Sequence, residues 1–347
     1  MFFWRIGLHF IFKTYFKIKA LFLLSYEKTQ YINNFCKDLE LVDRGKGIHT
    51  VKHIFYFVCF LFSFNIAHAH VIELITVKTF AKENATTTFR CRIPAKYDKS
   101  SVAKYRLLVY FGGRNTTGEN EVKSKSWGNW CDRNGVFLIV PSYKNDNYWE
   151  PQKWSGKALL EAITQLQRKY PNICDDKLLF YGYSAGAQCS NLFPAWIPER
   201  SRAYVSHACG VFHKPSERMK KVFGLITCGD ADRQRLIINH RFIEDYRKLG
   251  VNILWKSFPN HPHDVPQGST YLAQAFLEYY HKLYACDLDS TIPRPKESRK
   301  PIFIGDDIDG AIYPIDSPIG KQIYQEDRVC FFSKELADAW VRSATMP

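Results

Sequence analysis

Residues 177–186 read Lys177-Leu-Leu-Phe-Tyr-Gly-Tyr-Ser-Ala-Gly186, an apolar run that leads directly into Gly182-Tyr183-Ser184-Ala185-Gly186. The apolar run predicts a buried strand, and the residues after Gly186 follow a helical pattern. Glycines two positions before and after Ser184 suit a sharp turn, because they let the strand and the helix approach without side-chain clashes. Such a turn raises Ser184 above the sheet, at a helix N-terminus that favours negative charge. Ser184 is therefore the candidate nucleophile.

The chain around this segment alternates apolar, β-rich runs with helical patterns between residues 85 and 285. This alternation is typical of an α/β fold with a mostly parallel central sheet and helices on both faces. The predicted strands are 86–93, 105–111, 136–141, 177–183, 203–211, 222–228 and 251–258. The predicted helices lie at about 121–133, 156–170, 185–196, 235–249 and 269–284. The sequence shows no internal repeat or low-complexity tract in this region, so we expect one domain.

A serine nucleophile needs a base and an acid that orients the base, and both belong on loops that follow later strands. Two carboxylates, Asp230 and Asp232, follow the predicted strand 222–228. We expect Asp232 to be the orienting acid, because Asp230 comes directly after Gly229 and is better placed to brace the turn. Asp230 stays open as the alternative.

Two histidines, His261 and His263, follow the predicted strand 251–258. We expect His263 to be the base, because one more turn residue lets it fold back over Ser184 and it stands next to the final helix. His261 stays open as the alternative. The sequence thus predicts Ser184, Asp232 and His263 as a catalytic triad.

Acyl transfer also needs backbone donors for the oxyanion that develops, each worth about 2.7–4 kcal/mol. One donor would be the N–H of Ala185, directly after the serine. The other should come from the loop after the strand 105–111, which reads Gly112-Gly113-Arg114-Asn115. Glycines let amides face a site, so Gly113 is the candidate and Arg114 is the alternative.

An aromatic segment, residues 143–154, follows a predicted strand and so lies at the edge of the sheet that carries the site. Its Trp149 and Trp154 could stack on a sugar or a phenolic acyl group, or could anchor the loop to the domain. We also expect Arg114 and Tyr183 to contact the substrate, with Arg114 able to meet an anionic group.

With this G-x-S-x-G turn and the chain order Ser184, Asp232, His263, residues 85–285 resemble the α/β-hydrolase superfamily. Within it the chain is most similar to secreted esterases of the polyhydroxybutyrate-depolymerase and feruloyl or acetyl-xylan esterase group. The resemblance implies an acyl-enzyme mechanism on carboxylic esters, with acyl groups carried on carbohydrate or another polymer, and no metal or organic cofactor. The chain departs from the group at Phe111-Gly112, where His-Gly is frequent. The alternatives are a serine peptidase of the prolyl-oligopeptidase-like type and a non-catalytic binding module with a hydrolase fold.

The N-terminal 69 residues differ in composition from the rest and hold 12 of the 26 phenylalanines. Lys52 and His53 precede an apolar run at 54–66 and then Ala67-His68-Ala69, the pattern of a secretory signal. The run is shorter than the roughly 20 residues that span a bilayer. We therefore expect residues 51–69 to be a signal peptide, residues 1–50 to be a spurious upstream extension, and the mature protein to be secreted or periplasmic without a stable membrane span. The alternative makes residues 2–24 a membrane-surface helix.

The chain of 347 residues is 46% hydrophobic, 16% aromatic and 24% charged, which excludes a disordered or collagen-like chain. Its formal net charge is +14, and residues 70–347, with 39 basic and 30 acidic groups, keep +9 of it. The basic residues are scattered, with no arginine-rich run and no zinc-finger spacing. The sequence therefore predicts a solvated basic surface and no nucleic-acid partner.

Eight cysteines follow the expected signal peptide, and an even number permits disulfides in an exported protein. Cys189, Cys209 and Cys228 stand in apolar segments, where buried free thiols are the simpler expectation. The catalytic domain is predicted to span residues 70–286. Residues 287–347 are rich in Pro, Gly and Asp and predict an irregular appendage packed on the domain, with a short helix at 333–342. Three aspartates in the appendage lack the full ligand spacing of a calcium loop, so no metal is predicted: Asp306, Asp307 and Asp309.

Overall fold

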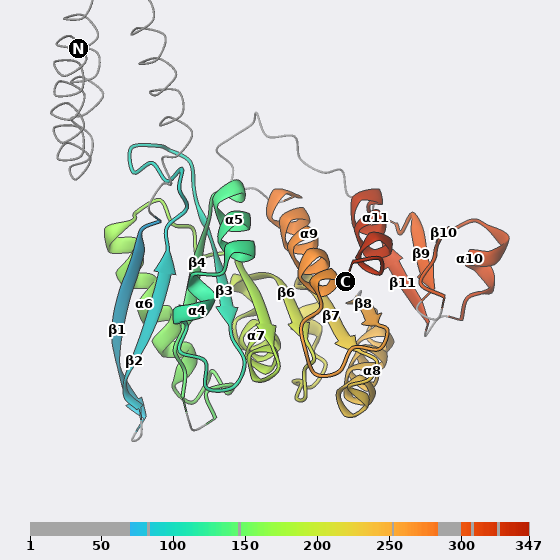
Figure 1. The fold of residues 1–347 in the computed structure, drawn as a ribbon, viewed down its shortest axis with the longest axis horizontal. Coiled ribbons are helices and arrows are strands. Elements are labelled where there is room, and N and C mark those ends of the chain that lie inside the picture. The colour runs from blue at the N-terminus through green and yellow to red at the C-terminus, as the bar shows by residue number, and fades with distance from the viewer. Residues whose placement is uncertain are drawn as a thin grey trace, which may run out of the picture. The chain divides into compact units, whose positions relative to one another are not determined.

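The computed structural model describes residues 70–81, 84–144, 147–251, 253–283, 300–306, 309–324 and 327–346. Eight strands form one sheet in the order β1-β2-β4-β3-β5-β6-β7-β8 (Figure 1). From β4 to β8 all neighbouring strands run parallel, whereas β1 pairs antiparallel with β2 and β2 antiparallel with β4. The strands are β1 (Ile72–Ala81), β2 (Asn84–Arg92), β3 (Arg106–Phe111), β4 (Val136–Pro141), β5 (Leu178–Tyr183), β6 (Ser201–His207), β7 (Phe223–Gly229) and β8 (Ile253–Phe258).

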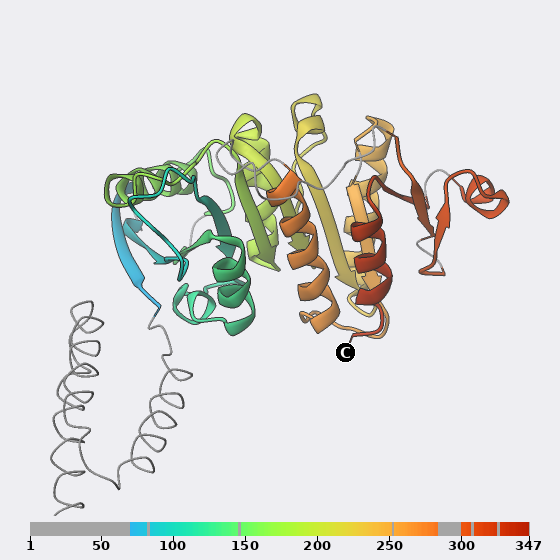
Figure 2. The ribbon, with the colours of Figure 1, turned by 90° about the horizontal axis from the view of Figure 1, so that it is seen from above.

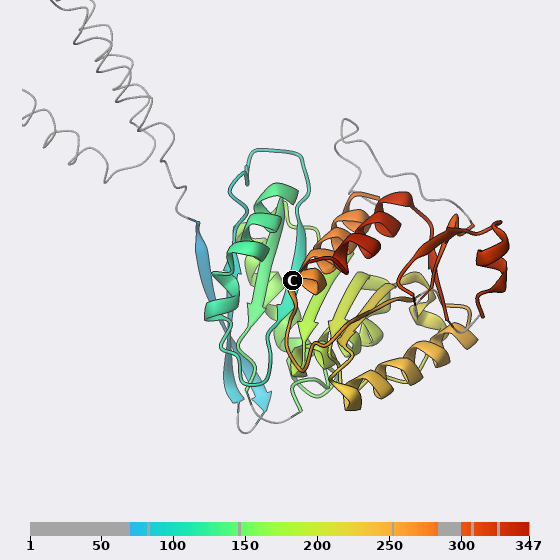
Figure 3. The same ribbon diagram turned by 45° about the vertical axis from the view of Figure 1, so that its right-hand side comes forward.

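Helices cover both faces of this sheet. Helices α5, α9 and α11 lie on one face, and α6, α7 and α8 lie on the other (Figure 2 and Figure 3). Two short 3₁₀ helices, η1 (Pro198–Arg200) and η2 (Glu217–Lys221), flank β6. The α-helices of this part of the chain are α4 (Glu119–Val122), α5 (Lys125–Asn134), α6 (Ser155–Lys169), α7 (Ala185–Trp196), α8 (Arg233–Lys248) and α9 (Gln267–Leu283).

The hydrophobic pattern explains these layers. Strand β4 reads Val-Phe-Leu-Ile-Val-Pro and all six residues are buried, as a strand covered on both faces requires. Helix α6 buries Leu159, Ile163 and Leu166, which recur at helical spacing, and burying each such side chain contributes about 1.5–3 kcal/mol. The predicted α/β class, with a mostly parallel sheet and helices on both faces, is confirmed.

Three elements differ from the expectation. Strand β1 was not predicted, although its buried Ile75 and Val77 alternate with exposed residues as a half-buried edge strand should. The predicted helix 121–133 is divided, because the Ser124 side chain accepts the Trp127 N–H and begins α5 anew. Strand β6 ends at His207, because Ala208 adopts a left-handed φ of 51° that turns the chain.

The C-terminal appendage contains a second sheet. Strands β9 (Phe303–Asp306), β10 (Ile312–Pro314) and β11 (Arg328–Phe331) are antiparallel in the order β10-β9-β11, with α10 (Pro318–Gln322) following β10. This sheet lies beyond β8, at the end of the large sheet opposite β1 (Figure 1 and Figure 3).

The last helix, α11 (Lys334–Ser343), confirms the helix expected near 333–342 and packs on α9. Its buried Trp340 donates from Nε1 to the Trp255 carbonyl at 2.6 Å, and the Lys256 ammonium lies 3.5 Å from the centre of the Trp340 ring. The appendage is therefore fastened to strand β8 of the large sheet.

The acidic segment of the appendage forms a turn. Asp309 accepts hydrogen bonds from the Ala311 N–H and the Tyr313 hydroxyl, while Asp307 lies outside the described residues. Within the described ranges no group of three or more His, Cys, Asp or Glu side chains is placed to hold a metal ion.

Cys189, Cys209 and Cys228 are buried free thiols, as expected. Burial raises the pKa of all three, that of Cys228 to about 12, so they stay protonated at neutral pH. The thiols of Cys91 and Cys131 are buried and free as well, whereas Cys36, Cys59 and Cys286 lie outside the described residues.

The expectations for residues 1–50 and 51–69 also lie outside the part of the chain that the structure describes. Within that part, none of the helices has the length and apolar character needed to cross a membrane.

Candidate active site

Ser184 occupies a strained turn between β5 and α7. Its φ and ψ are 56° and −119°, a backbone conformation that costs free energy for any residue with a side chain. A Cβ on Gly182 would lie 2.0 Å from the Gly186 carbonyl oxygen, and one on Gly186 would lie 2.2 Å from the Phe111 carbonyl oxygen. Both glycines are therefore required by the close approach of backbones, which is the reason the sequence suggests for them.

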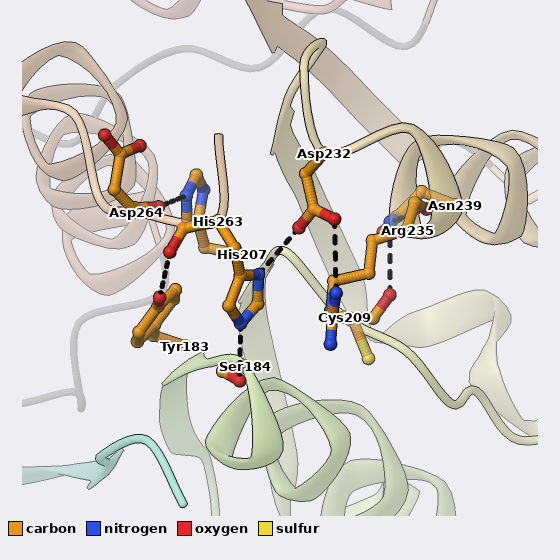
Figure 4. Close-up of polar contacts among 9 residues, drawn as sticks. All are labelled: Tyr183, Ser184, His207, Cys209, Asp232, Arg235, Asn239, His263 and Asp264. Atoms are coloured by element: carbon orange, nitrogen blue, oxygen red, sulfur yellow. Dashed lines mark hydrogen bonds and ion pairs between the residues drawn. The ribbon is translucent and has the colours of Figure 1, made fainter. Parts of the chain in front are cut away.

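Three side chains from separate loops form a continuous chain of hydrogen bonds (Figure 4). His263 Nε2 lies 2.8 Å from Ser184 Oγ, and His263 Nδ1 lies 2.6 Å from Asp232 Oδ2. An ionised carboxylate can only accept, so we assign the ring proton to Nδ1 and the lone pair to Nε2. In this tautomer His263 can take the proton of the Ser184 hydroxyl.

Asp232 follows β7, and its carboxylate lies between His263 and a guanidinium. Its side chain is 6% exposed and its Oδ1 pairs with the Arg235 guanidinium at 3.2 Å. Arg235 lies one turn further along, on α8, where a residue at i+3 faces the same side as the first. Sequence reasoning missed Arg235, although this spacing from Asp232 could have indicated it.

The structure places Asp230 and His261 elsewhere. The Asp230 carboxylate accepts the Asn260 N–H at 2.6 Å and braces the turn between the two loops. His261 Nδ1 lies 3.3 Å from Asp264 Oδ2. The structure thus brings the preferred pair, and neither alternative, to the serine.

Tyr183 braces the loop that carries the histidine. Its hydroxyl donates to the His263 carbonyl at 2.7 Å, and its ring lies 5.2 Å from the His263 ring (Figure 4). The expectation that Tyr183 contacts substrate stays a prediction, and the structure adds a role for its hydroxyl in holding this loop. Burial raises the pKa of this phenol, so it stays a donor at neutral pH.

His207, at the end of β6, supports the next residue of the same loop. Its Nε2 lies 2.7 Å from the Asp264 carbonyl oxygen, which can only accept, so Nε2 carries the proton. Its Nδ1 then accepts from the hydroxyls of Ser269 at 2.8 Å and Thr227 at 2.7 Å. Burial lowers the pKa of His207 to about 4, so the ring is neutral. Nothing in the local sequence singles out His207, because its partners are far away in the chain.

The predicted oxyanion donors are backbone N–H groups at the start of α7 and in the loop after β3. Ala185 is the first residue of α7, so its N–H has no acceptor within the helix. The Gly113 carbonyl accepts from the Thr116 hydroxyl at 2.7 Å, which fixes the loop. Among the described residues, the N–H groups of Gly113 and Arg114 donate to no backbone carbonyl.

The aromatic segment is mostly an anchor. Trp154 is 7% exposed and packs edge-on against Tyr143, with ring centres 5.3 Å apart. This burial leaves no face for a ligand, so stacking of Trp154 on substrate is corrected in favour of anchoring. Trp149 is half-buried against Tyr148, and Arg114 is exposed.

A small pocket lies beside the Gly113 loop, with a volume of about 210 Å³ that includes its open mouth. It lies between the loops after β3 and β4. Its walls are Phe111, Gly112, Gly113, Thr116, Pro141, Tyr143 and Tyr148.

The strand order and the site together define a class of protein. A mostly parallel sheet with antiparallel strands at one end carries a strained serine between a strand and a helix. An aspartate after β7 and a histidine after β8 complete the arrangement of the α/β-hydrolase fold. The chain has this fold.

Comparison with solved structures finds similar chains among hydrolases. A CE1 ferulic acid esterase from Anaeromyces mucronatus superimposes with a TM-score of 0.48 at 16% identity, over 60% of this chain and 90% of that one. The fluorophosphonate-binding serine hydrolase F of Staphylococcus aureus gives 0.45 at 12% identity, over 60% and 95%. Poly(aspartic acid) hydrolase-1 from a Sphingomonas species gives 0.46 at 16% identity, over 60% and 98%. The sequence matches no protein-family model, and comparison with curated proteins finds no relative.

Proposed function

We propose that this chain is a serine esterase that cleaves carboxylic esters through an acyl-enzyme. The observation that carries the proposal is the unbroken hydrogen-bond chain from Asp232 through His263 to Ser184 on a strained strand-to-helix turn. Nucleophile, base and orienting acid lie within hydrogen-bond distance of one another, which is the geometry that activates a serine.

The reaction runs in two halves. His263 Nε2 takes the Ser184 proton as Oγ attacks the ester carbonyl, and the oxyanion is held by the N–H groups of Ala185 and Gly113. The intermediate collapses, the alcohol leaves with the proton from His263, and the acyl group stays on Ser184. Water then gives its proton to His263 and attacks the acyl-enzyme, which releases the carboxylic acid and restores the serine hydroxyl. Asp232 stabilises the imidazolium in both halves. These steps use groups of this chain and water.

For the substrate we propose an acyl ester carried on carbohydrate or another polymer, met outside the cytoplasm by a secreted or periplasmic protein. The signal-like pattern at residues 51–69 supports export. The half-buried Trp149, in a segment that follows β4, supports contact with a sugar or a phenolic group.

The test is labelling of the protein with a fluorophosphonate probe, followed by turnover of acetyl, butyryl and feruloyl esters. We expect labelling in the wild type and in Ser126→Ala, which removes an exposed serine on α5, and none in Ser184→Ala. A folded wild-type protein that neither labels nor turns over an ester would favour the binding-module alternative. Labelling with turnover of peptides alone would favour the peptidase.

A further inference from the structure

The two side chains that contact the loop of His263 are neighbours in the sheet. Tyr183 is the last residue of β5 and His207 is the last residue of β6. The two residues are partners in the register of these parallel strands, and their rings lie 5.9 Å apart. Parallel strands have their carboxyl ends at one edge of the sheet, so both side chains lie where the loop after β8 passes.

Tyr183 and His207 bind consecutive carbonyl groups of this loop (Figure 4). The Tyr183 hydroxyl donates to the His263 carbonyl at 2.7 Å, and His207 Nε2 donates to the Asp264 carbonyl at 2.7 Å. In the part of the chain that the structure describes, no backbone N–H group donates to either carbonyl. The loop is therefore held at His263 by side chains and not by backbone pairing.

Tyr183 also contacts the loop after β3. A Cβ placed on Gly113 would lie 3.6 Å from Tyr183 Cδ1, which is an ordinary van der Waals distance. The Tyr183 ring centre lies 5.2 Å from that of His263. Because Tyr183 directly precedes Ser184, one residue is bonded to the nucleophile, hydrogen-bonded to the residue of the base, and next to the loop of a predicted oxyanion donor.

His207 is itself fixed by two further elements. Its Nδ1 lies 2.7 Å from the Thr227 hydroxyl on β7 and 2.8 Å from the Ser269 hydroxyl in the first turn of α9. The ring is fully buried, so it has little room to turn away from the Asp264 carbonyl. His207 is thus a rigid donor for the loop.

We propose that Tyr183 and His207 are positioning residues, which together hold His263 Nε2 within hydrogen-bond distance of Ser184 Oγ. Without them the loop would move, and the 2.8 Å contact between these two atoms would be present for a smaller fraction of the time. A displacement of 1 Å in an active site can cost about 100-fold in rate, so partial loosening should cost about 10-fold. The inference rests on the proposed esterase function.

The first test uses Tyr183→Phe, which removes the hydroxyl and keeps the ring. We measure kcat and KM for 4-nitrophenyl acetate, and the second-order rate constant for labelling of Ser184 by a fluorophosphonate probe. We expect kcat and the labelling rate constant both to fall about 10-fold, with KM within about twofold of the wild type. The probe reacts with Ser184 but carries neither the acyl group nor the alcohol of the ester, so a parallel fall indicates a displaced base. A raised KM with wild-type labelling would overturn the positioning role, because it would show that the hydroxyl contacts the ester.

Tyr246→Phe is the matched control. The Tyr246 hydroxyl lies 2.9 Å from His213 Nε2, and neither residue belongs to the loop of His263. Each variant loses one hydroxyl hydrogen bond, so the two melting temperatures should fall by similar amounts. Only Tyr183→Phe should lower kcat. Wild-type kcat in Tyr183→Phe, or an equal loss of kcat in Tyr246→Phe, overturns the proposal while the esterase function stands.

The second donor is tested by a pair of substitutions at His207. His207→Leu removes the donor, whereas His207→Gln keeps a donor for the Asp264 carbonyl and an acceptor for the two hydroxyls. We expect His207→Leu to lower kcat about 10-fold and His207→Gln to restore it. Equal losses of kcat in the two variants overturn the role of His207, and Tyr183→Phe decides the proposal where His207→Leu does not fold. A folded wild type that neither labels nor hydrolyses an ester overturns the esterase function itself.

Discussion

His207 should make the protein less stable in mild acid. Its ring is fully buried and neutral, with a pKa lowered by burial to about 4, whereas in the unfolded chain it should titrate near 6.5. Between these values the unfolded chain binds more protons than the folded one. The free energy of unfolding therefore falls as the pH falls through this window, and the contribution of His207 is fully retained only above pH 6.5.

The magnitude follows from the shift. A difference of about 2.5 pKa units corresponds to about 3 kcal/mol when the pH lies below both values. Between pH 7 and pH 5 the same two pKa values give a loss of about 2 kcal/mol. His207→Gln keeps a donor for the Asp264 carbonyl and an acceptor for the hydroxyls of Thr227 and Ser269, but it does not titrate.

Urea unfolding at pH 7 and pH 5 measures this directly. We expect the wild type to lose about 2 kcal/mol more than His207→Gln over this interval. His281 is a matched control, because burial also lowers its pKa to about 4. Its Nε2 lies 3.0 Å from the carbonyl oxygen of Asn134, a residue that does not belong to the catalytic loop. His281→Gln should show the same reduced pH dependence with kcat unchanged, and His207→Gln, which keeps the hydrogen bonds to the loop of His263, should also leave kcat at pH 7 nearly unchanged. Equal losses in the wild type and His207→Gln would refute the reasoning.

Three further substitutions test the site and its frame. Asp232→Asn should lower kcat about 10³–10⁴-fold, since the amide no longer holds the histidine in the required tautomer. Asp230→Asn should lower only the melting temperature. Equal losses of kcat in the two variants would contradict the assignment of Asp232 as the orienting acid. Trp154→Ala should cost about 3–5 kcal/mol in chemical unfolding, and half-buried Trp149→Ala less; the reverse order would show that Trp154 is not the anchor. Gly186→Ala should give no soluble folded protein, because its Cβ would lie 2.2 Å from a backbone oxygen. A variant with the circular dichroism spectrum and the melting temperature of the wild type would disprove that contact.

Local sequence was sufficient for the parts of the fold that depend on near neighbours. The turn at Ser184 needs glycines within two residues of it, and the burial of α6 needs apolar residues at helical spacing, so both patterns are visible in the sequence. Strand β1 was less visible, because only one of its faces is buried. The small sheet of the appendage depends on pairing between segments that are individually short and turn-rich. No local sequence pattern predicts such pairing.

The choice between neighbouring candidates also had a local basis. Asp230 directly follows Gly229, and the structure uses its carboxylate to brace the turn. That position leaves Asp232, two residues later, to face His263. The order of strands then brings the loops of Ser184, Asp232 and His263 together, because parallel strands have their carboxyl ends at one edge of the sheet.

The polar groups that could not be predicted from the sequence have one property in common: their partners lie far away in the chain. His207 meets Asp264 and Ser269, which follow it by 57 and 62 residues, and these contacts arise only because β6, β7 and β8 are neighbours. A pattern of residue types predicts which groups can pair, but only the packed structure reveals which groups meet. The turn at Ser184 is therefore visible in the sequence, whereas the group that supports the loop of His263 is visible only in the fold.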